Sequence, residues 1–178
     1  MDPVITVSTS ICMSVLFGVA AVHKLQSLAI FRSAMDEYQL IPRSLSGIAA
    51  VFVVTVELLA ALLVLIPVAR AAGLMVMAGL LFVYTAGISI NLLRGRRDID
   101  CGCSSFSSRH ELSGWLVLRN LLLLGLVLLA WGPASDRPLN WLDLLLIAFG
   151  VLITGGLYLS MNQLLAQAPR IARLRSGT

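Results

Sequence analysis

Five long apolar segments constrain the fold of this chain more than any other feature of its sequence. They cover approximately Val4–Val22, Ile48–Ala69, Ala71–Leu93, Leu112–Trp131 and Trp141–Leu159. A helix of about 18 or more apolar residues, rising about 1.5 Å per residue, is long enough to cross the hydrocarbon core of a bilayer. Composition agrees, because only 12% of the residues are charged, against about a quarter in soluble domains. We therefore predict an all-α integral membrane protein, a bundle of five transmembrane helices.

Two local features predict how these helices pack. The first segment is the least apolar, and its hydroxyl side chains are Thr6, Ser8, Thr9, Ser10 and Ser14. Since hydroxyls in a membrane helix bond to their own backbone or to a neighbouring helix, this segment is expected to face the bundle interior. The second and third segments are separated only by the residues around Pro67 and Arg70. They are expected to form a tight antiparallel hairpin.

Basic residues predict the orientation of the bundle. Ten of them fall on one side of it and two on the other. The ten are Lys24, Arg32, Arg43, Arg94, Arg96, Arg97, Arg109, Arg170, Arg173 and Arg175, and the two are Arg70 and Arg137. An excess of Lys and Arg in short loops marks the cytoplasmic side. The N-terminus is then outside and the C-terminus in the cytoplasm, which requires an odd number of spans.

The chain divides into one transmembrane domain, residues 1–166, and a short basic tail, residues 167–178. The arginines of the tail are expected to lie on an anionic membrane surface, where each contributes about 1 kcal/mol of binding. The basic character of the chain is accordingly a property of its membrane topology. We predict contact with the lipid bilayer and no nucleic-acid partner.

The segment most suggestive of chemistry is Cys101-Gly102-Cys103, which follows Arg94, Arg96 and Arg97. The thiolate is the reactive form of cysteine, and a disulfide across one glycine would be strained and therefore reactive. Thiol–disulfide redox chemistry at these two cysteines is the first interpretation. A soft-metal site with His110 as third ligand and a purely structural turn are the alternatives. Cys12, inside the first apolar segment, is expected to be an inert buried thiol.

A second candidate site consists of ionisable groups at membrane depth. Glu57 lies near the middle of the second predicted span and Arg119 lies inside the fourth, next to Asn120. His23 and Lys24 end the first span on the same side of the membrane. Since a charge at the bilayer centre costs about 2.5–3.5 kcal/mol even on the mildest scale, these groups should share a polar network. The network is either a structural ion pair or a relay for protons or thiols.

Several catalytic motifs are missing from the sequence. It has no glycine-rich phosphate loop after a strand and no His-Glu-x-x-His metal motif. Its two histidines do not support a Ser-His-Asp arrangement. The sequence therefore argues against hydrolase and nucleotide-dependent activities.

The order of these motifs resembles a known family. The motifs are His23-Lys24-Leu25, the Tyr-Gln-Leu-Ile-Pro run at 38–42, Glu57, the Asn-Leu-Leu-Arg-Gly-Arg run at 91–96, Cys101-Gly102-Cys103 and Arg119-Asn120. Together they resemble the methylamine-utilisation family MauE, over about residues 10 to 131. That family is similar to the DoxX membrane proteins, so the resemblance implies a DoxX-like four-helix core. The family usually continues the cysteine pair with Phe-Gly, where this chain has Ser104-Ser105-Phe106.

The resemblance implies an accessory role in the bacterial inner membrane, in the maturation of a periplasmic amine dehydrogenase. A thioredoxin-like redox protein and a disulfide-rich client protein are the implied partners. Cys101 and Cys103 would be catalytic, and the supporting polar residues would be His23, Lys24, Glu57, Arg94, Arg119 and Asn120. We predict no metal site and no bound cofactor, with a quinone or a soft metal left open. A non-catalytic assembly scaffold and a carrier of small solutes or metals are the alternative functions.

One conflict follows from these predictions. A periplasmic client suggests that Cys101 and Cys103 face outward, whereas the basic residues place them inside. We follow the charges, because the opposite orientation would put ten basic residues on the wrong side. A relay of reducing equivalents across the bundle would then need a partner or a cofactor, since the sequence has no second cysteine pair for the outer face.

Overall fold

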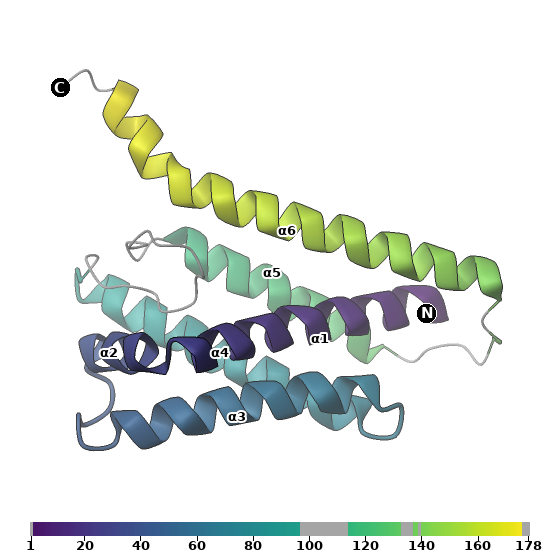
Figure 1. The fold of residues 1–178 in the computed structure, drawn as a ribbon, viewed down its shortest axis with the longest axis horizontal. Helices are drawn as coiled ribbons and strands as arrows, with labels where there is room; N and C mark the ends of the chain where they lie inside the picture. The colour runs from purple at the N-terminus through teal and green to yellow at the C-terminus, as the bar shows by residue number, and fades with distance from the viewer. Residues whose placement is uncertain (1, 97–113, 133–136, 139, 176–178) are drawn as a thin grey trace.

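The computed structural model describes residues 2–96, 114–132, 137, 138 and 140–175, with side chains in the last helix described as far as Leu157. Every regular element among these residues is an α-helix. The helices are α1 (Pro3–Gln26), α2 (Leu28–Tyr38), α3 (Ser46–Leu65), α4 (Arg70–Leu93), α5 (Gly114–Trp131) and α6 (Trp141–Arg175). Helices α1, α3, α4 and α5 are long and apolar enough to cross a membrane. The predicted all-α membrane bundle is confirmed (Figure 1).

Helix α1 packs against α3, α5 and α6. Thr6, Ser10 and Ser14 are buried. The Ser10 hydroxyl donates to the Thr6 carbonyl at 2.7 Å, and the Ser14 hydroxyl donates across the interface to the Ala61 carbonyl of α3, also at 2.7 Å. The expectation that this side of α1 faces the bundle interior is therefore correct, since three of its hydroxyl residues are buried and one of them bonds to a neighbouring helix.

Helices α3 and α4 form the predicted antiparallel hairpin, joined by Ile66–Ala69. Gly73 lets them approach closely near the turn. A Cβ atom at this position would lie 2.7 Å from Val64 Cγ2 and 2.8 Å from the Val64 backbone nitrogen. No side chain fits into that space without moving the α3 backbone, so the hairpin geometry depends on glycine here.

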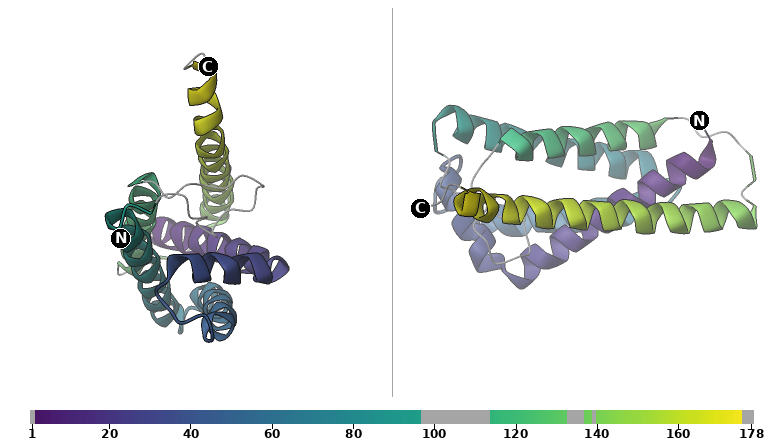
Figure 2. Two further views of the ribbon diagram at one scale, coloured as in Figure 1. Left: turned by 90° about the vertical axis from the view of Figure 1, so that its left-hand side faces the viewer. Right: turned by 90° about the horizontal axis from the view of Figure 1, so that it is seen from above.

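Helix α2 is a correction to the sequence analysis, which predicts no helix between the first and second spans. It buries Phe31 and Ala34, and Phe31 packs in one cluster with Ala50 and Val54 of the first half of α3. Seen from its own end of the bundle, α2 runs across the ends of the longer helices (Figure 2). Eleven residues of mixed polarity are too few for a membrane span, so a search for long apolar segments passes over this helix.

Helix α6 is longer than the fifth predicted span and reaches Arg175. Its described apolar part, Trp141–Leu157, is shorter than those of the other four candidate spans. The crossing of the membrane by α6 therefore stays a prediction. The helix packs against α1, and its C-terminal part extends away from the other helices (Figures 1 and 2). The predicted start of the basic tail, residue 167, lies within α6.

The two ends of the bundle contain different elements and charged residues. The N-terminus and the start of α6 lie at one end (Figure 1). There Arg137 pairs with Asp143 at 3.1 Å and with Asp2 at 3.5 Å, measured between side-chain nitrogen and oxygen atoms. At the opposite end lie α2, the end of α4 and the start of α5 (Figure 1). The candidate site lies toward this second end.

Candidate functional site

A buried ion pair joins Lys24, in the last turn of α1, to Glu57, in the middle of α3. Lys24 Nζ lies 2.5 Å from Glu57 Oε1, and the two side chains are 3% and 2% exposed. The interhelical contact of α1 and α3 brings them together although they are 33 positions apart in the sequence. Lys24 therefore directs its charge into the bundle instead of out toward the headgroups. Each charge is compensated at the depth where it would otherwise be most costly.

Tyr84 of α4 is the third member of this cluster. Its hydroxyl donates to Glu57 Oε1 at 2.7 Å and accepts a hydrogen bond from Lys24 Nζ at 3.3 Å. The ammonium group also lies 4.7 Å from the centroid of the Tyr84 ring and 5.0 Å from that of Phe31 on α2. These distances are typical of cation–π contacts, which stabilise a desolvated cation. Helices α1, α2, α3 and α4 thus all contribute to holding one lysine.

A small cavity of about 60 Å³ adjoins the ion pair. Its polar lining consists of Lys24, Glu57, Tyr84, Arg119 and Asn120, with apolar side chains of α1, α4 and α5 completing the wall. Glu57 Oε2 is buried and has no hydrogen-bond partner among the described residues. A polar cavity of this size has room for a few water molecules. The second carboxylate oxygen is therefore placed to accept a proton or a hydrogen bond from a small molecule.

The structure brings together four of the residues that the sequence analysis assigned to a polar network. Lys24 and Glu57 are bonded directly, and Arg119 and Asn120 of α5 line the same cavity. Glu57 forms its salt bridge with Lys24; the sequence analysis predicted a shared network of these residues and did not single out one cation as the partner of Glu57. The predicted depth of a residue in the membrane did not distinguish Lys24 from Arg119, because both were predicted to lie toward the same side of the membrane.

His23 and Arg94 are placed differently. His23 is half-buried, and its backbone carbonyl accepts the Ser27 hydroxyl at 2.9 Å. Arg94 is exposed at the C-terminal end of α4. Neither residue lines the cavity beside the ion pair. Cys101 and Cys103, like His110, lie outside the described residues.

Tyr84 is the site residue that the sequence analysis missed. It stands in the apolar run of α4, where the sequence reads Leu-Phe-Val-Tyr-Thr at 81–85. Buried tyrosine hydroxyls usually have a hydrogen-bond partner. A tyrosine far from both ends of a predicted span could therefore have indicated a polar partner inside the bundle. Only the packing of α4 beside α3 shows that the partner is Glu57.

The C-terminal end of α4 determines how the chain leaves the bundle toward the cysteine pair. The Gly95 amide donates to the Leu92 carbonyl and the Arg96 amide donates to the Asn91 carbonyl, both at 3.0 Å. Gly95 has φ of +72°, a left-handed conformation that glycine adopts without strain. This pattern is a Schellman cap. It ends α4 at Leu93, eight residues before Cys101, and leaves Arg94 exposed at the bundle end.

Metal binding has no support in the described part of the chain. No group of three His, Cys, Asp or Glu side chains there could hold a metal ion. The soft-metal alternative depends on Cys101, Cys103 and His110, which the structure does not describe. It stays an untested alternative.

The sequence was compared with known proteins, and the family model described as "Methylamine utilisation protein MauE" matches residues 1–133. This chain belongs to the MauE family. It is 36% identical to the methylamine utilization protein MauE of Paracoccus denitrificans over 140 residues, which are 78% of this chain and 75% of that protein. It is 32% identical to the MauE of Methylophilus methylotrophus over 128 residues, 71% of this chain and 67% of that one. No solved structure matches the chain significantly.

The MauE match covers α1 to α5 and ends before α6 begins. Every residue that lines the cavity beside the ion pair, and both cysteines of the Cys-Gly-Cys segment, lie inside the matched range. Family membership therefore applies to the part of the chain that carries the candidate site. Helix α6 lies outside the residues that the family model matches.

Proposed function

We propose that this MauE-family protein is a membrane accessory protein of methylamine utilisation that exchanges thiols and disulfides during the maturation of a periplasmic partner of the amine-dehydrogenase type. The single observation that carries the proposal is the Cys101-Gly102-Cys103 segment within the range matched by the family. The names of its relatives supply the metabolic context. A thioredoxin-like protein is the expected redox partner, and a disulfide-rich protein is the expected client.

The proposed chemistry is exchange through a mixed disulfide. A thiolate of one cysteine attacks a disulfide of the partner protein, one partner sulfur leaves as a thiolate, and a mixed disulfide forms. The second cysteine then attacks the mixed disulfide and releases the partner as a dithiol. Cys101 and Cys103 end as a disulfide, so the pair has given up two electrons and two protons.

The buried cluster has a supporting part in this proposal. Thiol oxidation releases protons, and Glu57 is an acidic group with one unpartnered oxygen beside a cavity large enough for water. We propose that Glu57 holds and passes a proton, with Lys24 and Tyr84 keeping its carboxylate in place. Arg119 and Asn120 would orient the water in that cavity.

Differential alkylation followed by mass spectrometry tests the redox cycle. The native protein and a reduced sample are each labelled in membranes, and the labelled fractions of Cys101 and Cys103 are compared. We expect both thiols to be protected in part before reduction and to label fully afterwards. Cys101→Ser should trap a mixed disulfide with a thioredoxin-like protein through Cys103, or the reverse substitution should do so. Cys12→Ser, in the buried part of α1, is the matched control and should change nothing.

Two other outcomes favour the alternative functions. If both thiols always label freely and no mixed disulfide forms, the redox proposal is wrong. A scaffold would then support client maturation even as the Cys101→Ser, Cys103→Ser double variant. A carrier would instead move its solute or metal in reconstituted vesicles, with or without a redox partner.

A further inference from the structure

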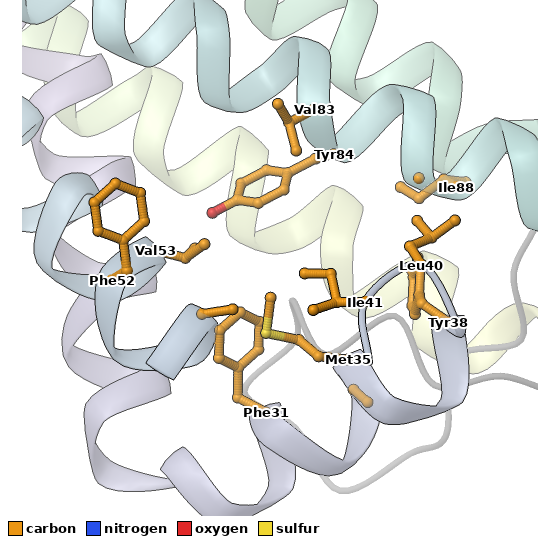
Figure 3. A pocket seen from close by; sticks show the side chains of 13 residues that line it. Phe31, Met35, Tyr38, Leu40, Ile41, Phe52, Val53, Val83, Tyr84 and Ile88 are labelled. Carbon is orange, nitrogen blue, oxygen red and sulfur yellow. The ribbon is translucent and has the colours of Figure 1, made fainter. Parts of the chain in front are cut away.

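Helix α2 is held to the bundle near its two ends, with a cavity beneath its middle. Near its start, Phe31 packs with Ala50 and Val54 of α3. Near its end, Tyr38 packs with Ile88 of α4. Between these contacts lies an apolar cavity of about 380 Å³, enclosed by α2, α3 and α4 (Figure 3). Segments with few buried contacts open at a low cost in free energy, so we expect α2 to open more easily than the long helices.

The two joints of α2 also favour movement. Ser27 joins it to α1 through a non-helical backbone with φ of −127° and ψ of 43°. The Ser27 hydroxyl donates to the His23 carbonyl of α1 and does not cap α2. At the other end, Gln39 has φ of +50°, a left-handed conformation that is strained for a residue other than glycine. A helix of eleven residues is marginal without support, so α2 should lose helical hydrogen bonds when it leaves the bundle.

Helix α2 covers the buried ion pair with one side chain, Phe31. The Phe31 ring lies 5.0 Å from Lys24 Nζ, and Lys24 stands two residues before the end of α1 at Gln26. The other contacts of the ammonium group come from Glu57 of α3 and Tyr84 of α4. Because α2 runs across the ends of the long helices here (Figure 2), its displacement would uncover the pair on the side nearest the end of the bundle.

We propose that α2 is a lid over the Lys24–Glu57 pair and that its opening admits water to the pair from the α2 end of the bundle. The inference rests on the proposed function, in which Glu57 holds and passes a proton. Both side chains are almost completely buried, so that proton needs a route to bulk water. The small cavity beside the pair lies among α1, α3, α4 and α5 and has room for only a few water molecules. The Glu57 proton passes to bulk water while α2 is open.

Lys24 reports on this movement, because it is the only lysine in the chain. The whole protein in phosphatidylcholine nanodiscs is treated with sulfosuccinimidyl acetate, a water-soluble reagent that acetylates amines. Peptide mass spectrometry separates Lys24 from the N-terminal amine, and a synthetic peptide of residues 20–28 gives the rate for a fully accessible lysine. Lys24 in the folded protein should react about 10- to 1,000-fold more slowly than in the peptide, as expected for an open form populated at about 0.1–10%.

Two pairs of variants change the packing of α2. Phe31→Ala removes the ring over Lys24 and should accelerate acetylation about tenfold or more. Its control is Ile30→Ala, at a neighbouring position that is 64% exposed. Ala34→Leu extends a side chain into the cavity, adds apolar contact beneath α2 and should slow acetylation about tenfold. Its control is Ala29→Leu, the same change on the exposed side of α2. Both controls should react like the original protein.

Hydrogen exchange distinguishes a moving lid from a permanent gap beside Lys24. Since α2 loses helical hydrogen bonds when it opens, Ala34→Leu should slow the exchange of the α2 amides and the acetylation of Lys24 by the same factor. Gly87→Leu fills the cavity from α4 and should act in the same direction. An added Cβ at Gly87 lies at ordinary contact distance, 3.6 Å from Tyr38. Helicity and a single gel-filtration peak establish that each variant is folded.

Three results would overturn the lid. They are no acetylation of Lys24 in the folded protein, equal rates in Ala34→Leu and Ala29→Leu, and a change in acetylation without a change in the exchange of α2. The Cys101→Ser, Cys103→Ser double variant should be acetylated at the original rate, because the lid does not involve the cysteines. Lid opening in a protein whose thiols do not cycle would refute the proposed function and keep the lid. Thiol cycling without acetylation of Lys24 would refute the lid and keep the function.

Discussion

At the scale of single residues, Lys24 and Glu57 explain why two charges persist inside an apolar bundle. Each is almost completely buried, and an unpaired charge in that position would cost several kcal/mol. The Tyr84 hydroxyl and the rings of Phe31 and Tyr84 complete the surroundings of the ammonium group. The remaining oxygen, Glu57 Oε2, is the one polar atom of the pair that the described residues leave unbonded. Glu57 Oε1 therefore serves the stability of the bundle, and the proposed proton transfer falls to Glu57 Oε2.

The ion pair predicts a specific pattern of stability. Glu57→Gln leaves the Lys24 cation buried without its counter-ion, which should lower the free energy of unfolding by about 3–5 kcal/mol. Lys24→Met should be destabilising for the converse reason, and the double variant should regain part of the loss because no charge is stranded. Unfolding in mixed micelles by added dodecyl sulfate measures this. Glu37→Gln, on the exposed face of α2, is the control. Strictly additive losses in the double variant would contradict the coupling.

At the scale of elements, the helices differ in what makes them recognisable. Long apolar runs identify α1, α3, α4 and α5. Helix α2 has no such run, and it is stabilised because Phe31 is buried against α3, with Leu28 and Met35 packed beside it. Its position matters for function, since it closes one side of the apolar cavity and supplies a ring over Lys24. The contact of α3 with α4 sets the opposite side, and Gly73 sets how close those two helices come.

Two glycines of α4 provide a test of that close contact. Gly73→Ala should destabilise the hairpin by about 1–3 kcal/mol, because the new methyl group overlaps the Val64 backbone. Gly79→Ala is the matched control: nothing lies within 4 Å of a Cβ atom there, and alanine is the better helix former by about 1 kcal/mol. The same micelle unfolding experiment applies. Equal stability of the two variants would show that α3 and α4 are not packed as closely as described.

At the scale of the whole molecule, the helices form one bundle with two unlike ends. The end with α2 and the exit of α4 carries Lys24, Arg32, Arg43, Arg94 and Arg96, whereas the opposite end carries Arg70 and Arg137. Arg137 is bound by Asp2 and Asp143, so the start of α6 is tied to the start of α1. The hydrogen bond and the charge of Asp143, together with the charge of Asp2, raise the pKa of Arg137. This guanidinium therefore stays charged and compensates the two carboxylates at its own end of the bundle.

The distribution of basic residues between the two ends predicts the membrane topology. We expect the α2 end to face the cytoplasm, because short loops rich in Lys and Arg are retained there. Fusions to alkaline phosphatase, which is active only outside the cytoplasm, and to a fluorescent protein that is active inside are made after residues 70, 105, 137 and 178. Phosphatase activity is expected at 70 and 137, and fluorescence at 105 and 178. Phosphatase activity at 105 would reverse the orientation and place Cys101 and Cys103 in the periplasm.

The sequence by itself determined the helical class, four of the spans, the α3–α4 hairpin and the interior position of α1. These follow from properties of consecutive residues: the length of an apolar run, the spacing of hydroxyls and the shortness of a connection. It also named Lys24, Glu57, Arg119 and Asn120 as residues that must avoid lipid, since the cost of burying a polar group does not depend on the fold.

Only the tertiary structure decided which of these groups meet. Lys24 contacts Glu57 because α1 and α3 cross at those turns, and Tyr84 joins them because α4 lies beside α3. Helix α2 and the apolar cavity beneath it likewise depend on contacts between segments far apart in the chain. A salt bridge or a cavity forms between side chains of different helices. The distance between two helices is set by the packing of all their side chains together, so it cannot be read from one segment of the sequence.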